Sequence, residues 1–254
     1  MEVIDLHSHV LPGLDDGPAD MHGSIALARA AVAAGTRLMA ATPHVGLRYH
    51  VVPSELAGRV AELTEALADA RIPLEVVTGG ELAPTLAAHI RDDELQAIAL
   101  GGSSCVLLEC PFKKAQPMSR LVARLQRRGF RVLLAHPERS PEFLRDPLEL
   151  AAVVEDGAYV QITAASLRGY FGRTVRRYSI DLLEAGLVHV VASDAHDVLD
   201  RGPSVREIVQ SAARRHGLSP ALTEYVTETA PRALLEDAAP PCPHAGASRR
   251  WPLG

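Results

Sequence analysis

The chain has 254 residues, of which 47% are hydrophobic and 22% charged, enough apolar material for one large folded domain. Its formal net charge of −5 at pH 7 gives no attraction for nucleic-acid phosphates or anionic lipids. No basic stretch leads into a long apolar run, and no window reaches the roughly 18 consecutive apolar residues that span a bilayer. We therefore expect a cytoplasmic protein with no nucleic-acid partner and no stable membrane insertion.

Seven short apolar runs rich in Val, Ile and Leu alternate with longer segments of helical period, which predicts parallel strands joined by helices. The expected strands are Val3–Leu6, Leu38–Thr42, Leu74–Gly79, Cys105–Glu109, Val132–Ala135, Ala158–Ile162 and Val188–Ser193. The expected helices are Met21–Ala34, Ser54–Ala70, Pro117–Arg128, Pro147–Asp156, Thr174–Ala185 and Pro203–His216. An α/β fold follows, either a closed or nearly closed βα barrel or a doubly wound open sheet.

The chain shows no internal repeat and no second domain, so one domain is expected over residues 1–237. Residues 238–254 are dense in Pro, Ala and Gly, a composition typical of a disordered tail. Cys105, Cys110 and Cys242 have neither the spacing of a zinc site nor an even number for a disulfide framework. We expect reduced thiols without a catalytic role.

Imidazoles and carboxylates gather where the predicted strands end. His7 and His9 stand two positions apart at the first strand, and strand residues with this spacing point to the same side. The same spacing recurs in Asp194 and His196 after the last strand. The ends of other strands carry His44 in ATPH, Glu81 in GGEL, Glu109 in LLECP and His136 in LLAHPER. Six of the seven strands thus bring a metal-capable side chain to one rim, where barrel enzymes place their chemistry.

Each of these residues taken alone also fits an ordinary role as a turn former, a helix cap or an ion-pair partner. That explanation does not extend to all of them together, because they occur at the same end of successive strands. The pattern therefore indicates a metal site. Nitrogen and oxygen ligands without a thiolate suit manganese, iron or zinc.

The chain resembles the polymerase-and-histidinol-phosphatase (PHP) family, and within it the manganese-dependent protein-tyrosine phosphatases of bacterial capsule and exopolysaccharide loci. The resemblance covers about residues 3–210 and rests on the motifs DLHSHVLPGLDDG, ATPH, GGEL, LLECP, LLAHPER, QITAASLRGYFGR and ASDAH, in that order. It implies a distorted seven-stranded (β/α)7 barrel that holds three divalent metal ions, with manganese favoured over iron or zinc.

The resemblance also implies three groups of metal ligands. The first comprises His7, His9, Glu81 and Asp194, the second Glu81, Glu109 and His136, and the third Asp16, His44 and His196. Asp15 competes with Asp16 for its role, and the sequence leaves open which of the two faces inward. Arg139 and Arg201 occupy the positions of phosphate-binding arginines.

By the same resemblance, the function is direct attack of a metal-bridging hydroxide on phosphotyrosine, in exopolysaccharide or capsule regulation. The implied partner is a phosphotyrosine protein, such as an exopolysaccharide-type tyrosine kinase. Two positions depart from the family pattern. Ala83 stands where these phosphatases commonly carry an arginine, and Val45 where a second histidine often follows. These departures leave the shape of the substrate pocket open.

Three other functions remain to be weighed. A histidinol-phosphate or other small-molecule phosphatase would use the same metals in a narrower pocket. A deoxyribonuclease of the TatD type also begins with HxH, but it normally lacks the TPH and DxH contributions to a third metal, and the acidic chain disfavours DNA. A non-catalytic metal-binding scaffold is the third, although every expected ligand is present.

Overall fold

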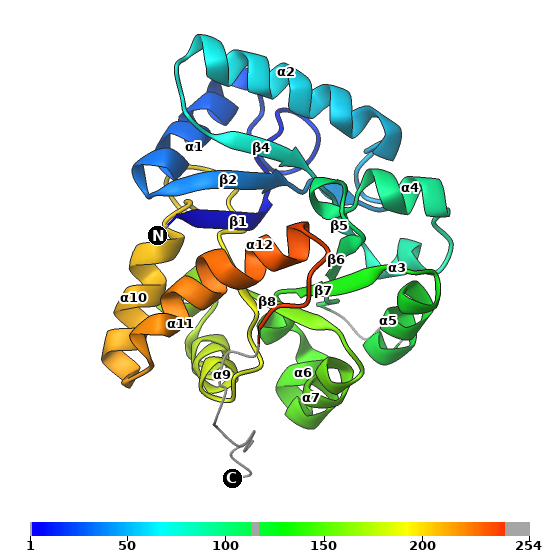
Figure 1. The fold of residues 1–254 in the computed structure, drawn as a ribbon, viewed down its shortest axis with the longest axis vertical. Coiled ribbons are helices and arrows are strands. Elements are labelled where there is room, and N and C mark those ends of the chain that lie inside the picture. Colours follow the sequence, from blue (N-terminus) through cyan, green and yellow to red (C-terminus); the bar gives the residue numbers. More distant parts are fainter. Residues whose placement is uncertain (1, 113–116, 242–254) are drawn as a thin grey trace.

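The computed structural model describes residues 2–112 and 117–241, so Cys242 and most of the expected tail lie outside the described residues. The fold is of the α/β type, with parallel strands joined by helices (Figure 1). Within the described residues, no helix has the length and apolarity that crossing a membrane requires. Ala238 is still attached to the fold, because its carbonyl accepts a hydrogen bond from Arg131 Nη2 at 2.6 Å.

Every predicted strand has a counterpart, and two of them are interrupted. The described residues form the strands β1 (Val3–Ser8), β2 (Thr36–Ala41), β3 (His44–Val45), β4 (Glu75–Thr78), β5 (Glu81–Leu82), β6 (Cys105–Glu109), β7 (Arg131–Ala135), β8 (Tyr159–Thr163) and β9 (Val190–Ala192). The predicted strand Leu38–Thr42 corresponds to β2, after which the chain continues as β3. The predicted strand Leu74–Gly79 corresponds to β4 and continues as β5.

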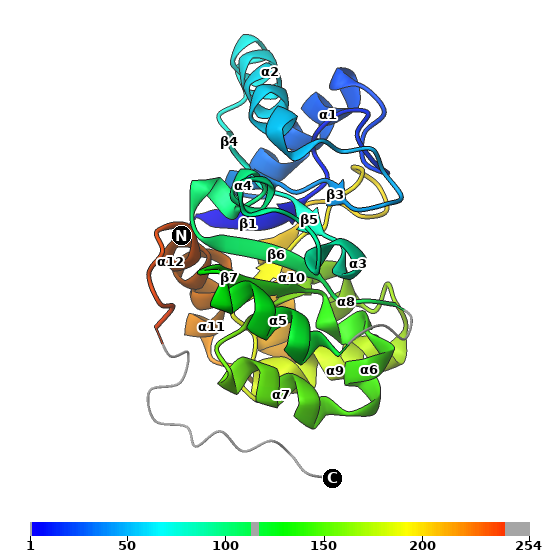
Figure 2. The same cartoon turned by 90° about the vertical axis from the view of Figure 1, so that its right-hand side faces the viewer.

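The six predicted helices are present, and shorter ones were missed. The described helices are α1 (Met21–Ala33), α2 (Leu56–Asp69), α3 (Pro84–Ala87), α4 (Asp92–Ala97), α5 (Met118–Arg127), α6 (Pro141–Arg145), α7 (Pro147–Glu155), α8 (Ala164–Arg168), α9 (Arg173–Glu184), α10 (Val205–His216), α11 (Pro220–Glu224) and α12 (Ala230–Leu235). Figure 2 shows α1 and α2 at one end of the molecule and α5, α7 and α9 at the other, with strands between them.

The strands form two hydrogen-bonded sheets. The expected single seven-stranded barrel is therefore corrected, because its hydrogen bonds do not run continuously from strand to strand. One sheet has the order β1-β2-β4 and the other β3-β5-β6-β7-β8-β9, with all neighbours parallel. The ladder is interrupted at Pro43, which has no N–H to donate, and at the pair Gly79 and Gly80. On the other side, Asp194 N donates to the carbonyl of His7 at 2.9 Å, which ties β1 to the segment after β9.

Apolar side chains from both sheets fill one common interior. The members on strands are Ile4, Leu6, Ala40, Cys105, Leu107, Leu133, Ala135, Val190 and Ala192. On each of β1, β6, β7 and β9 these residues are two positions apart, as expected for side chains that point to one face of a strand. A second, larger set of buried apolar residues packs the helices against the outer faces. The strands are therefore covered on both sides, which explains their near-continuous hydrophobic sequences.

The break between β4 and β5 depends on close packing at Gly80. A Cβ atom at this position would lie 2.9 Å from Ile98 Cβ and 2.9 Å from Val45 Cγ2. Glycine therefore lets the chain pass against a buried wall just before Glu81.

We expect Gly80→Ala to lower the free energy of unfolding by about 1–3 kcal/mol, because the added methyl group overpacks this wall. Gly58→Ala is the matched control, since Gly58 is an exposed residue of helix α2 with no atom within 4 Å of the added Cβ. That change should stabilise the protein by about 0.5 kcal/mol through helix propensity. Urea denaturation of both variants measures the difference. Equal stability of the Gly80 variant and the wild type would contradict the packing argument.

Candidate metal centre

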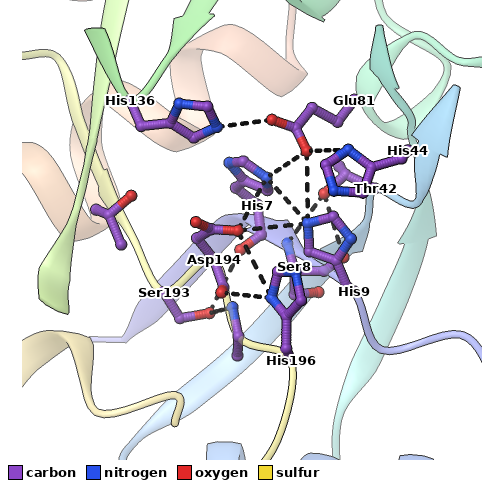
Figure 3. A network of polar contacts seen from close by, with 12 residues as sticks. His7, Ser8, His9, Thr42, His44, Glu81, His136, Ser193, Asp194 and His196 are labelled. Carbon is purple, nitrogen blue, oxygen red and sulfur yellow. Dashed lines mark hydrogen bonds and ion pairs between the residues drawn. The ribbon is translucent and has the colours of Figure 1, made fainter. Parts of the chain in front are cut away.

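Six strands, β1, β3, β5, β6, β7 and β9, and the loops that follow them bring nine imidazole or carboxylate side chains to one place, which we call the candidate centre. It consists of His7, His9, Asp16, His44, Glu81, Glu109, His136, Asp194 and His196. Figure 3 labels all of them except Asp16 and Glu109 and shows the labelled side chains gathered around His7, His9 and Asp194, with Glu81 and His136 on one side and His196 on the other. The nine residues span 190 positions of sequence, and parallel strands place their carboxyl ends at the same edge.

The innermost group joins two histidines and two carboxylates. His7 Nε2 and His9 Nε2 lie 3.3 Å apart. Asp194 Oδ1 lies 3.4 Å from the first nitrogen and 3.3 Å from the second. Glu81 Oε2 lies 3.3 Å and 3.5 Å from the same two atoms. The side chains expected around a first metal thus direct their ligand atoms at one point, deep in the protein.

Glu81 connects this group to both neighbouring ones. Its Oε1 lies 2.7 Å from His136 Nε2, and its Oε2 lies 2.9 Å from His44 Nδ1. Glu109 differs from the expected grouping. Its ligand atoms cluster with those of His44 and Glu81, whereas His136 clusters with His7 and Glu81. The expected second group is therefore divided between two sides of Glu81.

The two adjacent aspartates have different positions. Asp16 Oδ1 lies 3.5 Å from His44 Nε2 and 3.3 Å from His196 Nε2, as a shared ligand to a third metal would. Asp15 instead reaches His9 Nδ1 with its Oδ2 at 2.6 Å and accepts a hydrogen bond from the backbone N–H of His44 at 2.9 Å. Asp16 faces the candidate centre, and Asp15 orients the His9 ring from behind.

Gln161 is a site residue that the sequence reasoning missed. It lies on β8, and its Oε1 is 3.0 Å from His7 Nδ1. An amide oxygen can only accept, so this contact places a proton on His7 Nδ1 and leaves the lone pair of Nε2 for a metal. An amide is not a usual metal ligand, so the spacing of metal-capable residues gave no signal for it.

The two predicted phosphate-binding arginines meet at the candidate centre. Arg139 Nη1 donates to Asp194 Oδ2 at 2.8 Å, and Arg201 Nη2 donates to the same oxygen. Asp194 therefore uses Oδ1 toward the histidines and Oδ2 toward the arginines. Both guanidinium groups are mostly buried and lie at the edge of the centre, where an anion could reach them.

Two residues that turn the chain at the centre have unusual backbone conformations. His136 has φ of 39° and Asp194 has φ of 51°, a left-handed region that side chains other than glycine rarely adopt. Each follows the end of a strand, β7 and β9. Such backbone strain concentrates at functional sites, where the surrounding structure holds it in place.

The buried charges shift the acid–base properties of the centre. Burial opposes protonation of His9, but the hydrogen bonds that its ring donates to Asp15 and Asp194 outweigh burial and raise the pKa of His9 to about 10. Burial, reinforced by the charge of Arg139, lowers the pKa of His136 to about 4. Burial and the neighbouring carboxylate of Glu81 raise the pKa of Glu109 to about 7.

The donor set fits a divalent cation. His7 Nδ1 contacts Gln161 and His9 Nδ1 contacts Asp15, so the Nε2 lone pairs of both rings point into the same space as the two carboxylates. Four electron-pair donors that face one another are stabilised by a positive charge between them. The raised pKa of His9 is consistent with this, because a proton can supply that charge when no metal is bound.

A model of the family described as capsular polysaccharide synthesis, CpsB/CapC, matches residues 3–236. The chain belongs to the CpsB/CapC family. Every residue of the candidate centre lies within the matched range. Together with the curated tyrosine phosphatases and the solved structure described next, this match confirms the resemblance to tyrosine phosphatases of capsule loci.

Curated tyrosine phosphatases are similar to this chain over most of its length. Tyrosine-protein phosphatase YwqE of Bacillus subtilis strain 168 is 36% identical over 219 residues, or 85% of each chain. Tyrosine-protein phosphatase CpsB of Streptococcus pneumoniae is 26% identical over 242 residues, which covers 92% of this chain and 99% of that protein.

Solved structures agree with this placement. A crystal structure from work on YwqE and CpsB, described as unique metal-dependent tyrosine phosphatases, matches with a TM-score of 0.81 at 36% identity and covers 93% of this chain and 95% of that one. A histidinol phosphate phosphatase from Lactococcus lactis matches with a TM-score of 0.52 at 12% identity, covering 86% and 95%. The second likeness shows the fold alone.

The two shifted histidines of this CpsB/CapC member give a pH prediction for the protein without added metal. His9 should keep its second ring proton up to about pH 10, and His136 should stay neutral down to about pH 4. At pH 7 the two rings should therefore differ in charge. Ring nitrogen NMR between pH 5.5 and 8 measures this, with a histidine peptide of ordinary pKa, about 6.5, as the reference. Titration of both rings near the reference value would contradict the prediction.

Proposed function

We propose that this protein is a metal-dependent protein-tyrosine phosphatase that acts in capsule or exopolysaccharide regulation. The observation that carries the proposal is Asp194, whose two oxygens face two histidines on one side and two arginines on the other. A cation site and an anion site thus lie side by side, as hydrolysis of a phosphate ester requires. The tyrosine phosphatases YwqE and CpsB in the same family support the substrate class.

The proposed cofactor is a set of three divalent metal ions, with manganese favoured by the resemblance. The residues that would hold them are His7, His9, Asp16, His44, Glu81, Glu109, His136, Asp194 and His196. When bound, such ions lower the pKa of water toward neutrality and neutralise charge on phosphoryl oxygens. The burial of most of these side chains keeps bulk water from competing for the ligand atoms.

The arginines would bind the phosphoryl group. A planar guanidinium offers paired donors that match two non-bridging oxygens and keeps its charge at any working pH. Arg139 and Arg201 already converge on one acceptor, Asp194 Oδ2, so a phosphate could take over their free N–H donors with little movement. A tyrosyl oxygen leaves more readily than an alkoxide, because a phenol has a pKa of about 10.

The proposal extends to the fold and the partner. We infer that the two sheets together form a distorted seven-stranded barrel. The apolar interior shared by strands of both sheets and the bonds between His7 and the segment at Asp194 support this. A phosphotyrosine protein, such as an exopolysaccharide-type tyrosine kinase, is the proposed partner.

Hydrolysis of a phosphotyrosine peptide, measured beside histidinol phosphate with and without Mn²⁺, tests the function. We expect metal-dependent turnover with a preference for the peptide. His136→Ala should reduce turnover by more than about a hundredfold, since even residues that only support a ligand cost 10–100-fold. His22→Ala, which changes an exposed histidine of α1, is the matched control and should behave as the wild type. Faster hydrolysis of histidinol phosphate would favour the small-molecule phosphatase, and a metal-loaded protein without turnover would favour a scaffold.

The contact between Gln161 and His7 gives a prediction that does not depend on turnover. Gln161→Leu should weaken Mn²⁺ binding about 10–100-fold, because the His7 ring loses the acceptor that fixes its orientation. Isothermal titration calorimetry on the metal-free protein measures the affinity. Gln126→Leu is the control, since Gln126 also makes a side-chain hydrogen bond, to the carbonyl of Asp156 on the surface. Unchanged affinity in the Gln161 variant would show that His7 needs no such support.

A further inference from the structure

Phe112 is an aromatic residue beside the candidate centre that the proposed chemistry does not use. It lies three residues after the end of β6 and is 45% exposed. Its ring is stacked on that of His136, with centroids 5.4 Å apart and an interplanar angle of 15°. An apolar ring that remains partly in water next to a polar centre offers contact area to a ligand.

Arg139 fixes the position of this ring relative to the anion site. The guanidinium carbon of Arg139 lies 4.7 Å from the centroid of Phe112 and 4.2 Å from that of Phe171. The same guanidinium donates to Asp194. Cations prefer the faces of aromatic rings, so these contacts hold the arginine and Phe112 together. A phosphate bound to Arg139 would lie close to Phe112.

We propose that Phe112 contacts the aromatic ring of the substrate and makes the site favour aryl over alkyl phosphate esters. This inference rests on the proposed phosphatase function. In phosphotyrosine the ring is bonded directly to the ester oxygen, so a phosphoryl group on Arg139 brings that ring to the arginine's aromatic neighbour. The single methylene group of phosphoserine offers far less area for such a contact.

A second aromatic residue lies on the opposite side of the centre. The ring of Tyr49 is stacked on His44, with centroids 5.4 Å apart and an angle of 9°, and Arg48 lies over it at 4.9 Å. Among the hydrogen bonds of the described residues, however, Arg139 and not Arg48 reaches Asp194. The ring joined to the anion site is therefore Phe112.

Binding of phenylphosphonate and of methylphosphonate to the Mn²⁺-loaded protein tests the proposal by calorimetry. Both ligands carry the same anionic group, and only one carries a ring. Phe112→Leu should weaken the binding of phenylphosphonate about three- to tenfold and change the affinity for methylphosphonate by less than about twofold. Leucine keeps the apolar volume of the side chain but lacks the aromatic contact. Phe112→Tyr should retain the preference for the phenyl ligand.

Phe171→Leu is the matched control, since Phe171 also lies against Arg139. Because Phe171 acts only through Arg139, Phe171→Leu should change the affinities for both phosphonates by the same factor. Equal weakening of both ligands in Phe112→Leu would overturn the proposal and leave Phe112 as a support for Arg139. Selective loss of phenylphosphonate in Tyr49→Leu, with Phe112→Leu unaffected, would also overturn it.

Turnover of a phosphotyrosine peptide by the same proteins separates this inference from the proposed function. In Phe112→Leu, kcat/KM for the peptide should fall by the same factor as the phenylphosphonate affinity. A wild type that hydrolyses no peptide overturns the phosphatase function and this inference with it. An active wild type whose ligand preference is unchanged in Phe112→Leu overturns the inference alone.

Discussion

The structure depends on electron-pair donors that face one another in a buried place. The Nε2 atoms of His7 and His9 lie 3.3 Å apart, and the carboxylates of Glu81 and Asp194 each lie within 3.5 Å of both nitrogens. In a medium of low dielectric constant, such an arrangement is stable only with positive charge inside it. The raised pKa of His9 is consistent with a proton that meets this need, and a metal bound there would take the place of that proton.

The fold supplies both the core and the centre from the same faces of the same strands. On β6, Cys105 and Leu107 point into the shared interior, and Glu109 is the next residue of that series. On β9, Val190 and Ala192 do the same, and Asp194 follows them. Every second residue of a strand points to the same face. When such residues bury apolar side chains along the strand, the next one in the series lies at the edge of the core. The apolar packing below thus positions the ligand atoms above it.

The strands and most of the candidate metal ligands could be predicted from the sequence, whereas the division into sheets and the supporting contacts could not. The strands and their positions along the chain were predictable because buried parallel strands have continuous apolar sequences. Paired ligands such as His7 and His9 were predictable because a spacing of two residues is a local feature of the sequence. The division into two sheets was not predictable, since it depends on how Pro43 interrupts a ladder between distant segments. Gln161 was missed because an amide is not a usual metal ligand, and its partner His7, 154 positions away, gave no local signal.

The choice between the adjacent aspartates shows what only three dimensions can supply. Both residues have the same chemistry, and one step along a turn separates them. The backbone N–H groups of Gly17 and His44 donate to Asp15, which holds that carboxylate against His9. A carboxylate that already accepts these bonds has fewer lone pairs for a metal, whereas Asp16 remains free to face His44 and His196. The hydrogen bonds of the loop therefore divide the two roles, with one aspartate orienting a ligand and the other offered as a ligand itself.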